Sequence, residues 1–316
     1  MIMDDGGMDD ERKTLVSASK GLRGIIVPMV TPFKADEDID WQALSTNLEY
    51  LIRHKVHGLF PLGSQGEFHA LSLREKKQLI DFVTEKVSGR ILVVVGASGI
   101  TTRESIELSQ HTERAGADVI SILTPFFITP NQAELREHYL RIAEKVSIPI
   151  LAYNNPSRTG VNLLPATMAA IAEEASHVVG IKDSSGNLGQ TAEYIRLCPA
   201  TFRTFIGRDT LVYAGLMYGC AGAVAATANV VPGLVVSIYE AVQEGDHKQA
   251  RDLQRQLSRL RYAFRLGTFP VVVKEAMELA GLPAGPARSP IQPLGANARQ
   301  ELRGILEELG ALTRKG

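Results

Sequence analysis

Lys182 is the residue of this sequence best suited to covalent chemistry. It ends the short apolar run 178–181 and is followed by an acid, two serines and Gly186. A run of this kind is typical of a buried strand, and burial disfavours the charged form of a lysine. A neutral amine is a nucleophile, and Schiff-base formation with a carbonyl substrate is the reaction that most needs one. The alternative interpretation is a strand-end lysine whose stem packs while its ammonium reaches water.

Further polar residues lie in and just after the preceding strand-like run, residues 148–156. Tyr153 lies in this run, and Arg158 follows it shortly before Gly160. Parallel strands that are neighbours in a sheet end at the same edge. If these two strands are adjacent, a tyrosine hydroxyl, a lysine amine and an arginine meet at one end of the sheet.

Ser64 and Gln65 stand between two glycines, Gly63 and Gly66, directly after another apolar run. Glycines on both sides of a hydroxyl residue can expose successive backbone N–H groups, which form a concave site for a carboxylate or another anion. The alternative is an ordinary glycine-rich turn between a strand and a helix. Both interpretations stay open on spacing alone.

Two further candidate positions for substrate binding follow the last apolar runs. Gly207 precedes Arg208 and Asp209, a segment that could also bind a phosphate group, and Thr227 follows the final run. The histidines have no neighbouring carboxylates that would complete a zinc site, and the acidic residues 36–40 lack the glycine and final glutamate of a calcium loop. No metal site and no cofactor is expected.

The elements that must position these residues alternate along the chain. From Gly24 onward, an apolar strand-like run is followed by an amphipathic helix-like run, eight times. The predicted strands cover residues 24–33, 57–63, 91–98, 118–126, 148–153, 178–182, 202–209 and 221–229. This pattern predicts an α/β fold, a (β/α)8 TIM barrel, whose active site lies at the carboxyl ends of the strands. An open doubly wound sheet is the alternative, but no glycine-rich nucleotide loop follows the first run.

The domain organisation follows from where this alternation begins and stops. We expect a flexible tail over residues 1–20, the barrel over 21–245 and a C-terminal helical region over 246–316 that packs on the barrel. In that last region, helices are predicted over 248–266, 271–279 and 298–312. Helix starts are also predicted at two capping boxes, Ser72 with Glu75 and Thr101 with Glu104.

Composition narrows the possible partners. The net charge is −1, and no basic stripe or polybasic segment indicates nucleic acid or a membrane surface as a partner. The two cysteines are too few for a disulfide framework, which fits a reducing compartment, and the N-terminus has no apolar signal segment. A cytoplasmic protein is expected.

Four motifs in order resemble the dihydrodipicolinate synthase and N-acetylneuraminate lyase superfamily. They are Gly63-Ser64-Gln65-Gly66-Glu67, Tyr153-Asn154-Asn155-Pro156, Gly180-Ile181-Lys182-Asp183 and Thr227-Ala228-Asn229. The likeness runs from about Gly24 to the C-terminus. It implies a class I lyase or aldolase whose small-molecule substrate is pyruvate or another 2-oxo acid. It also implies a homotetramer built as a dimer of dimers.

The resemblance also implies residue roles. Lys182 would form the Schiff base, Tyr153 would shuttle the proton, and Ser64 and Gln65 would hold the substrate carboxylate. The imine is itself the electron sink, so no metal or organic cofactor is implied. Arg158 matches the arginine with which the synthases bind the carboxylate of the second substrate, which favours condensation of pyruvate with aspartate semialdehyde.

Three departures favour a different member of the superfamily. Ser64 and Gln65 stand where the synthases usually have two threonines, and Phe127 stands where they have a tyrosine that completes a hydroxyl relay across the dimer. A phenylalanine cannot pass a proton, and a glutamine amide suits a polyhydroxylated or carboxylated substrate. A 2-keto-3-deoxy sugar acid or 4-hydroxy-2-oxo acid aldolase or dehydratase is therefore the alternative. Two more distant alternatives are a barrel that only binds a ligand, without catalysis, and an enzyme that acts on phosphorylated substrates.

Overall fold

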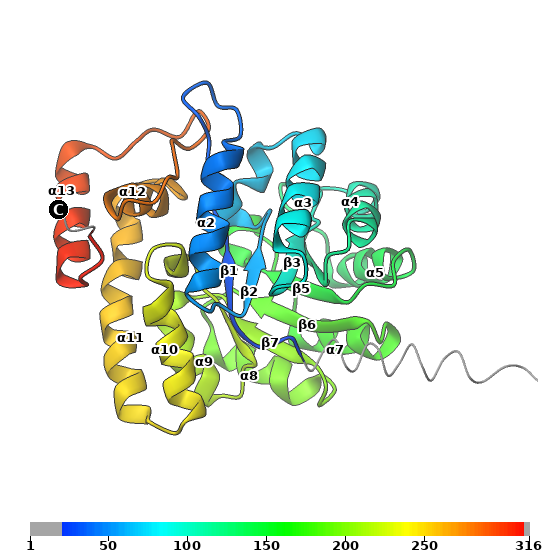
Figure 1. Ribbon diagram of the computed structural model, residues 1–316. Helices are drawn as coiled ribbons and strands as arrows, with labels where there is room; N and C mark the ends of the chain where they lie inside the picture. The colour runs from blue at the N-terminus through cyan, green and yellow to red at the C-terminus, as the bar shows by residue number, and fades with distance from the viewer. Residues whose placement is uncertain (1–20, 313–316) are drawn as a thin grey trace, which may run out of the picture.

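Eight parallel strands close into a barrel in the computed structural model of the protein, which describes residues 21–312. Each strand pairs with the next along the chain, and β8 pairs with β1. The strands are β1 (Gly24–Pro28), β2 (Gly58–Phe60), β3 (Leu92–Gly96), β4 (Val119–Leu123), β5 (Ile150–Asn154), β6 (Val178–Asp183), β7 (Arg203–Ile206) and β8 (Gly222–Val224). The (β/α)8 barrel predicted from the sequence is confirmed (Figure 1).

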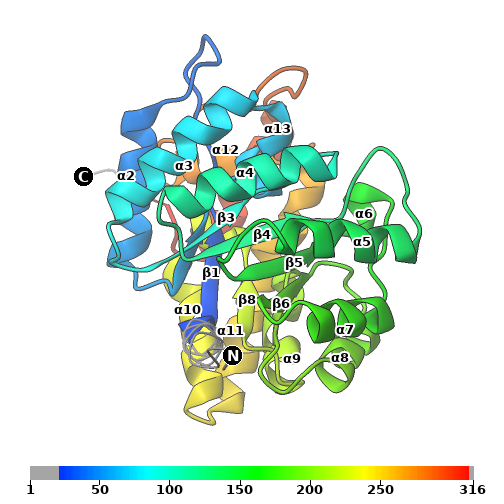
Figure 2. The same ribbon diagram turned by 90° about the vertical axis from the view of Figure 1, so that its right-hand side faces the viewer.

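Helices surround the barrel, as the two views in Figures 1 and 2 show. They are α2 (Trp41–Arg53), α3 (Leu73–Val87), α4 (Thr102–Arg114), α5 (Gln132–Ala143), α6 (Pro156–Thr159), α7 (Pro165–Glu174), α8 (Leu188–Leu197), α9 (Val212–Met217) and α10 (Pro232–Gln243). In α2 the buried residues Leu44, Leu48 and Leu51 recur at helical spacing on one face. Strands β4 and β5 are buried at every residue, because a parallel sheet covered by helices has no solvent face.

Both predicted helix starts are correct, but only one of the two capping boxes is complete. Ser72 and Glu75 form a complete capping box at the start of α3. At α4 the Thr101 side chain accepts the backbone N–H of Glu104, but the Glu104 carboxylate accepts instead from Ile100 and from Lys76. The reciprocal bond of the box is missing there because this carboxylate has an ion-pair partner on α3.

The strands are shorter than the sequence pattern suggested. The first was expected to reach Phe33, but β1 ends at Pro28, and Phe33 forms only an isolated antiparallel bridge with Ile39. Pro28 and Pro32 have no N–H group to donate to a neighbouring strand. The last predicted strand likewise ends at Val224, and residues 226–229 form a 3-10 turn.

Three further helices follow the barrel: α11 (His247–Tyr262), α12 (Val271–Leu279) and α13 (Ala296–Glu308). Figure 1 shows them on one side of the barrel, next to α10. Buried Leu260, Met277 and Leu302 form their shared core, which also includes Val30 and Val230 from the barrel loops. The predicted helical region is therefore packed against the loops at the barrel's carboxyl end.

Polar contacts join this C-terminal region to the loop after β2 and to the start of α3. Lys274 of α12 forms an ion pair with Glu67, at 2.6 Å between Nζ and Oε1, and both side chains are buried. Arg288 donates two side-chain hydrogen bonds to Glu75 at the start of α3. The C-terminal helices thus form one wall of the barrel mouth.

The expected N-terminal tail, residues 1–20, lies outside the described part of the chain. Between residues 21 and 312, no helix has the length and apolar character that a membrane span requires.

Candidate active site

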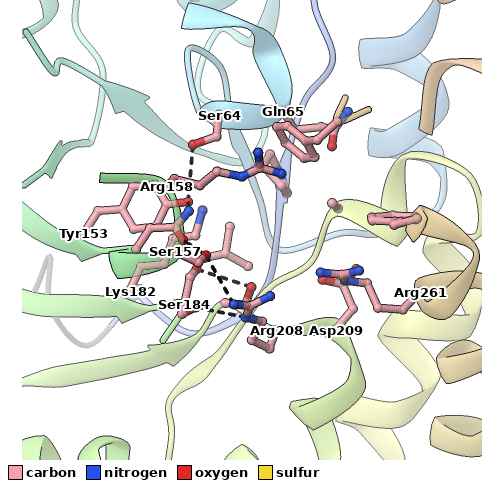
Figure 3. Close-up of a pocket in the computed structure, with 17 residues that line it drawn as sticks. Ser64, Gln65, Tyr153, Ser157, Arg158, Lys182, Ser184, Arg208, Asp209 and Arg261 are labelled. Atoms are coloured by element: carbon pink, nitrogen blue, oxygen red, sulfur yellow. Dashed lines mark hydrogen bonds between the residues drawn. The ribbon is translucent and has the colours of Figure 1, made fainter. Parts of the chain in front are cut away.

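A cavity of about 340 Å³ opens at the carboxyl end of the barrel. Its lining comes from the ends of β5 and β6, from the loops after β2, β7 and β8, and from α11 and the segment before α12. All the site residues expected from the sequence line it except Thr227. Figure 3 shows how their side chains converge.

Lys182 and Tyr153 lie side by side in the sheet. Strands β5 and β6 are neighbours, and their register pairs Tyr153 with Lys182. The Lys182 Nζ atom lies 3.9 Å from the centroid of the Tyr153 ring and 4.7 Å from that of Phe60. Both residues are at most 5% exposed, and Lys182 forms no ion pair within residues 21–312. The amine is therefore held against aromatic faces with no carboxylate to fix its charge.

The Tyr153 hydroxyl is surrounded by side chains that can hydrogen-bond to it. It lies 3.5 Å from the Ser64 hydroxyl and accepts a hydrogen bond from the Asn155 amide at 2.9 Å. Burial by itself raises the pKa of Tyr153, but the positive charge of Lys182 and hydrogen bonds with Ser64, Ser184 and Lys182 outweigh burial and leave this pKa below its ordinary value. A phenol with a lowered pKa beside a lysine is suited to moving protons between the amine and a substrate.

The loop after β2 forms a 3-10 turn, Ser64–Gly66, rather than an irregular segment. The N–H groups of Ser64 and Gln65 donate to no protein acceptor among the described residues, as is usual at the start of a helical turn. A Cβ atom at Gly66 would lie 2.9 Å from the Met29 carbonyl oxygen, so a larger residue would push the turn away from β1. Two N–H groups therefore stay available at the cavity, as the anion-site interpretation requires.

Gln65 is almost fully buried, and the amide nitrogen of its side chain contacts the C-terminal region. Its Nε2 donates to the Pro270 carbonyl at 3.3 Å, while its Oε1 has no hydrogen-bond partner in the part of the chain that the structure describes. A buried amide oxygen without a hydrogen-bond donor is uncommon, because no new hydrogen bond offsets the free energy that it costs to remove water from this oxygen. Gln65 thus lines the cavity and has a buried amide oxygen without a donor in residues 21–312.

Arg158 lies in α6 at the cavity mouth, where Pro156 starts the helix. Its guanidinium stacks on the ring of Phe269, at 4.5 Å from the centroid. Phe269 belongs to the segment just before α12, so a residue more than a hundred positions away orients Arg158.

Gly207 and Thr227 have different surroundings. Gly207 lines the cavity, and a Cβ there would lie 2.0 Å from the Ser184 hydroxyl, so the loop after β7 needs a glycine at this point. Thr227 is buried beneath the cavity, where its N–H and hydroxyl both donate to Asp209 at 2.7 Å. Thr227 therefore positions Asp209 and does not line the cavity.

Phe127 lies outside the cavity of its own chain. Its side chain is 91% exposed, and it does not line the cavity. The hydroxyl partners of Tyr153 in the described residues come from Ser64 and Ser184, with the amide of Asn155.

Three cavity residues had no local signal in the sequence. Arg261 of α11, with Phe264 and Phe269, reaches the cavity from the C-terminal region. Asn155 was visible only as part of the Tyr153 motif. A helix carrying several arginines, as α11 does, gives no sign of which one faces a cavity.

Comparison with known proteins gives one consistent result. The family model of the Dihydrodipicolinate synthetase family matches residues 21–309. The 4-hydroxy-tetrahydrodipicolinate synthase of Methanopyrus kandleri is 39% identical, over 93% of this chain and 99% of its own length. An uncharacterized DapA-like lyase of Halobacterium salinarum is 38% identical, over 92% of this chain and 95% of its own.

Solved structures agree with the sequence matches. Dihydrodipicolinate synthase from Aquifex aeolicus superposes with a TM-score of 0.90 at 30% identity, and the match covers 93% of this chain and all of that one. YagE, a prophage protein of Escherichia coli K12 that was solved in complex with pyruvate, has a TM-score of 0.88 at 32% identity and covers 92% of this chain and 99% of its own.

Proposed function

Because the chain belongs to the dihydrodipicolinate synthetase family of lyases, we propose that Lys182 forms a Schiff base with pyruvate and that the enzyme condenses it with aspartate semialdehyde. This is the reaction of a 4-hydroxy-tetrahydrodipicolinate synthase, the name of several of its relatives. One observation carries the proposal. The Lys182 amine is buried at the base of the cavity, without an ion pair in residues 21–312, against a tyrosine of lowered pKa.

The proposed steps balance without an outside oxidant. The Lys182 amine adds to the C2 carbonyl of pyruvate, and loss of water gives a protonated imine. Removal of a C3 proton gives the enamine, whose C3 attacks the aldehyde carbon. The aldehyde oxygen takes up a proton. The amino group of aspartate semialdehyde then attacks the imine carbon, which closes the ring, breaks the bond to Lys182 and releases the lysine as its amine. Tyr153 is positioned to carry the protons, with Ser64 at 3.5 Å as its partner.

The carboxylates of the two substrates are assigned to separate groups. The free N–H groups of Ser64 and Gln65 would hold the carboxylate of pyruvate, since backbone donors at a helical turn suit an anion. The Arg158 guanidinium at the mouth would hold the carboxylate of the aldehyde substrate. With the two carboxylates assigned in this way, the enamine carbon would lie between the two anion sites.

A borohydride experiment tests the Schiff base directly. Pyruvate followed by sodium borohydride should add one reduced pyruvate unit to the protein, and peptide mapping should place it on Lys182. Lys182→Ala should give no adduct, whereas the control Lys77→Ala, which removes a half-buried lysine paired with Glu107, should give the same amount as wild type. An adduct that persists in Lys182→Ala, or that maps to buried Lys274 instead, would refute the mechanism.

A 2-keto-3-deoxy sugar acid aldolase or dehydratase is the second candidate. The unpaired Gln65 Oε1 favours it, because a sugar hydroxyl would supply the missing donor. The two candidates differ in the second assay. Turnover of pyruvate with aspartate semialdehyde supports the synthase, and cleavage or dehydration of a sugar acid without that turnover supports the alternative.

We also propose a homotetramer built as a dimer of dimers, and a cytoplasmic location. The family resemblance supports the first. The second is supported by two cysteines that are both buried and unpaired.

A further inference from the structure

A second cavity of about 420 Å³ adjoins the catalytic one. The two share five lining residues, among them Arg158, Arg208 and Arg261. The outer cavity is therefore the mouth of the inner one, and a ligand long enough to extend from Lys182 would pass between these arginines (Figure 3).

The charge of this mouth is unbalanced. Four arginines line the outer cavity and no acidic residue does. Arg265 is paired with Glu301 at 3.0 Å, but Arg158, Arg208 and Arg261 form no ion pair within residues 21–312. Three positive charges thus share one small space without a fixed partner.

The inner cavity has one acidic residue, Asp209, against three arginines. Asp209 accepts two hydrogen bonds from Thr227 through a single carboxylate oxygen. Burial is the main effect that lowers the pKa of Arg261; Asp209 opposes it, and the guanidinium groups of Arg208 and Arg158 lower this pKa further. Bringing these like charges together costs free energy, and an anionic ligand would offset that cost.

The guanidinium groups are oriented for a ligand. Arg261 stacks on Phe264 at 4.6 Å, and Arg158 stacks on Phe269 at 4.5 Å. A guanidinium group over an aromatic ring makes a cation–π contact, which does not use its N–H groups as hydrogen-bond donors to another residue. Arg208 is fixed through Nε, which donates to the Ser184 carbonyl at 2.9 Å, so its terminal nitrogens remain close to the cavity.

We propose that Arg208 and Arg261 form a second anion site at the cavity mouth, beside Arg158, which takes the distal acidic group of a substrate whose carbonyl lies at Lys182. That group is a carboxylate or a phosphate, both of which arginine edges bind in a planar or bidentate manner. The inference rests on the proposed Schiff-base function and narrows its substrate class. Arg158 alone is enough for one carboxylate on the second substrate, so the additional two arginines indicate a further negative group.

Matched 2-oxo acids test the site without knowledge of the natural substrate. The pairs are 2-oxoglutarate with 2-oxopentanoate and 2-oxoadipate with 2-oxohexanoate, which have equal chain lengths and differ in a terminal carboxylate. The measured quantity is the concentration that gives half-maximal borohydride-trapped adduct on Lys182. In wild type, at least one dicarboxylate should need a concentration about ten- to hundredfold lower than its monocarboxylate counterpart, the range for charge-assisted hydrogen bonds.

The variants are Arg208→Gln and Arg261→Gln. Each should remove most of this preference, and the ratio within a pair cancels any general loss of adduct formation. Arg261→Gln is the cleaner variant, since the Arg261 side chain makes no hydrogen bond in residues 21–312. Arg259→Gln is the matched control, because Arg259 is on the same helix but pairs with Glu308. It should keep the wild-type preference.

The outcomes separate this proposal from the proposed function. No preference in wild type, or one that both variants retain, would overturn the anion site while leaving the Schiff base intact. If wild type formed no adduct at all, the proposed function would fail. The site would then be judged by thermal shift with glutarate and with inorganic phosphate, against sodium chloride at equal ionic strength. A rise in Tm that Arg261→Gln abolishes would support the site. Which of the two probes, glutarate or phosphate, causes the rise would tell a carboxylate site from a phosphate site. No rise in Tm with either probe would overturn the site.

Discussion

Lys182 and Tyr153 give this cavity its chemical character through a single contact. A lysine normally extends into water, but here its amine lies over the Tyr153 ring and both residues are buried. Burial raises the pKa of Tyr153, but the positive charge of Lys182 and nearby hydrogen bonds outweigh it and leave this pKa below its ordinary value. This contact supports the proposal that the pair exchanges a proton with the substrate.

Removing the Tyr153 hydroxyl should slow the reaction and spare the covalent intermediate. Tyr153→Phe keeps the ring under Lys182 but has no proton to pass, so kcat should fall by about 10²–10⁴-fold, the usual contribution of a positioned acid or base. The borohydride adduct with pyruvate should still form, although more slowly.

The exposed tyrosine Tyr218 provides the control, and Tyr218→Phe should have the wild-type kcat. Wild-type turnover in Tyr153→Phe would show that another group or a water moves the proton.

At the scale of elements, the start of α3 has a double role. Glu75 closes the capping box with Ser72 and also binds Arg288 from the C-terminal segment. The pKa of Glu75 is lowered from 4.5 to about 2. The hydrogen bond from Arg288 is the largest cause, burial opposes the shift, and the hydrogen bonds from Ser72 lower this pKa further. One carboxylate thus couples a helix start to a segment more than two hundred residues away.

This coupling should be visible in acid. Because the pKa of Glu75 is lower in the folded state, its contribution to stability is complete above about pH 4.5 and is lost as the pH falls toward 2. Glu75→Gln keeps an acceptor for the cap but has no charge. The urea midpoint of the variant should therefore lie below that of wild type at pH 7, and the two should converge near pH 2.

Parallel pH profiles of wild type and Glu75→Gln would contradict this assignment. The exposed Glu107, whose pKa is lowered by Lys77, supplies a control at a site without a long-range link. Glu107→Gln should have a smaller effect at pH 7, since exposed ion pairs contribute little.

For the molecule as a whole, the barrel and the C-terminal helices act as one cavity wall. The buried Glu67–Lys274 ion pair lies just behind the Ser64–Gly66 turn and joins it to α12. Burial lowers the pKa of Lys274 to about 8, although the Glu67 charge opposes the shift. The turn that would hold the substrate carboxylate therefore depends on a lysine outside the barrel.

Breaking this pair on one side should destabilise the fold strongly. Lys274→Met leaves the Glu67 carboxylate buried and uncompensated, which should lower the free energy of unfolding by about 3–5 kcal/mol. The double variant Glu67→Gln with Lys274→Met removes both charges and should recover a large part of that loss in urea unfolding at pH 7. Equal stability of the single and double variants would show that the pair is not coupled.

The sequence alone predicted the barrel, which is confirmed, and pointed to the residues of the proposed catalytic pair and the proposed anion loop. Eight alternations of apolar runs and amphipathic helices leave few other topologies, and neighbouring parallel strands bring Tyr153 and Lys182 to the same edge. Ser64, Gln65, Arg158 and Gly207 were visible because they follow strand ends, where barrel loops carry functional residues. Strand lengths were overestimated, since apolar residues continue past the last ladder hydrogen bond.

Only the tertiary structure decided which distant residues complete the cavity. Arg261 and Phe269 belong to the C-terminal region, where helical periodicity predicts a buried face but cannot say against which loop it packs. The same holds for Thr227, which follows a strand but turns beneath the cavity to bind Asp209. Local patterns depend on neighbours along the chain, whereas these contacts depend on how separate elements pack in space.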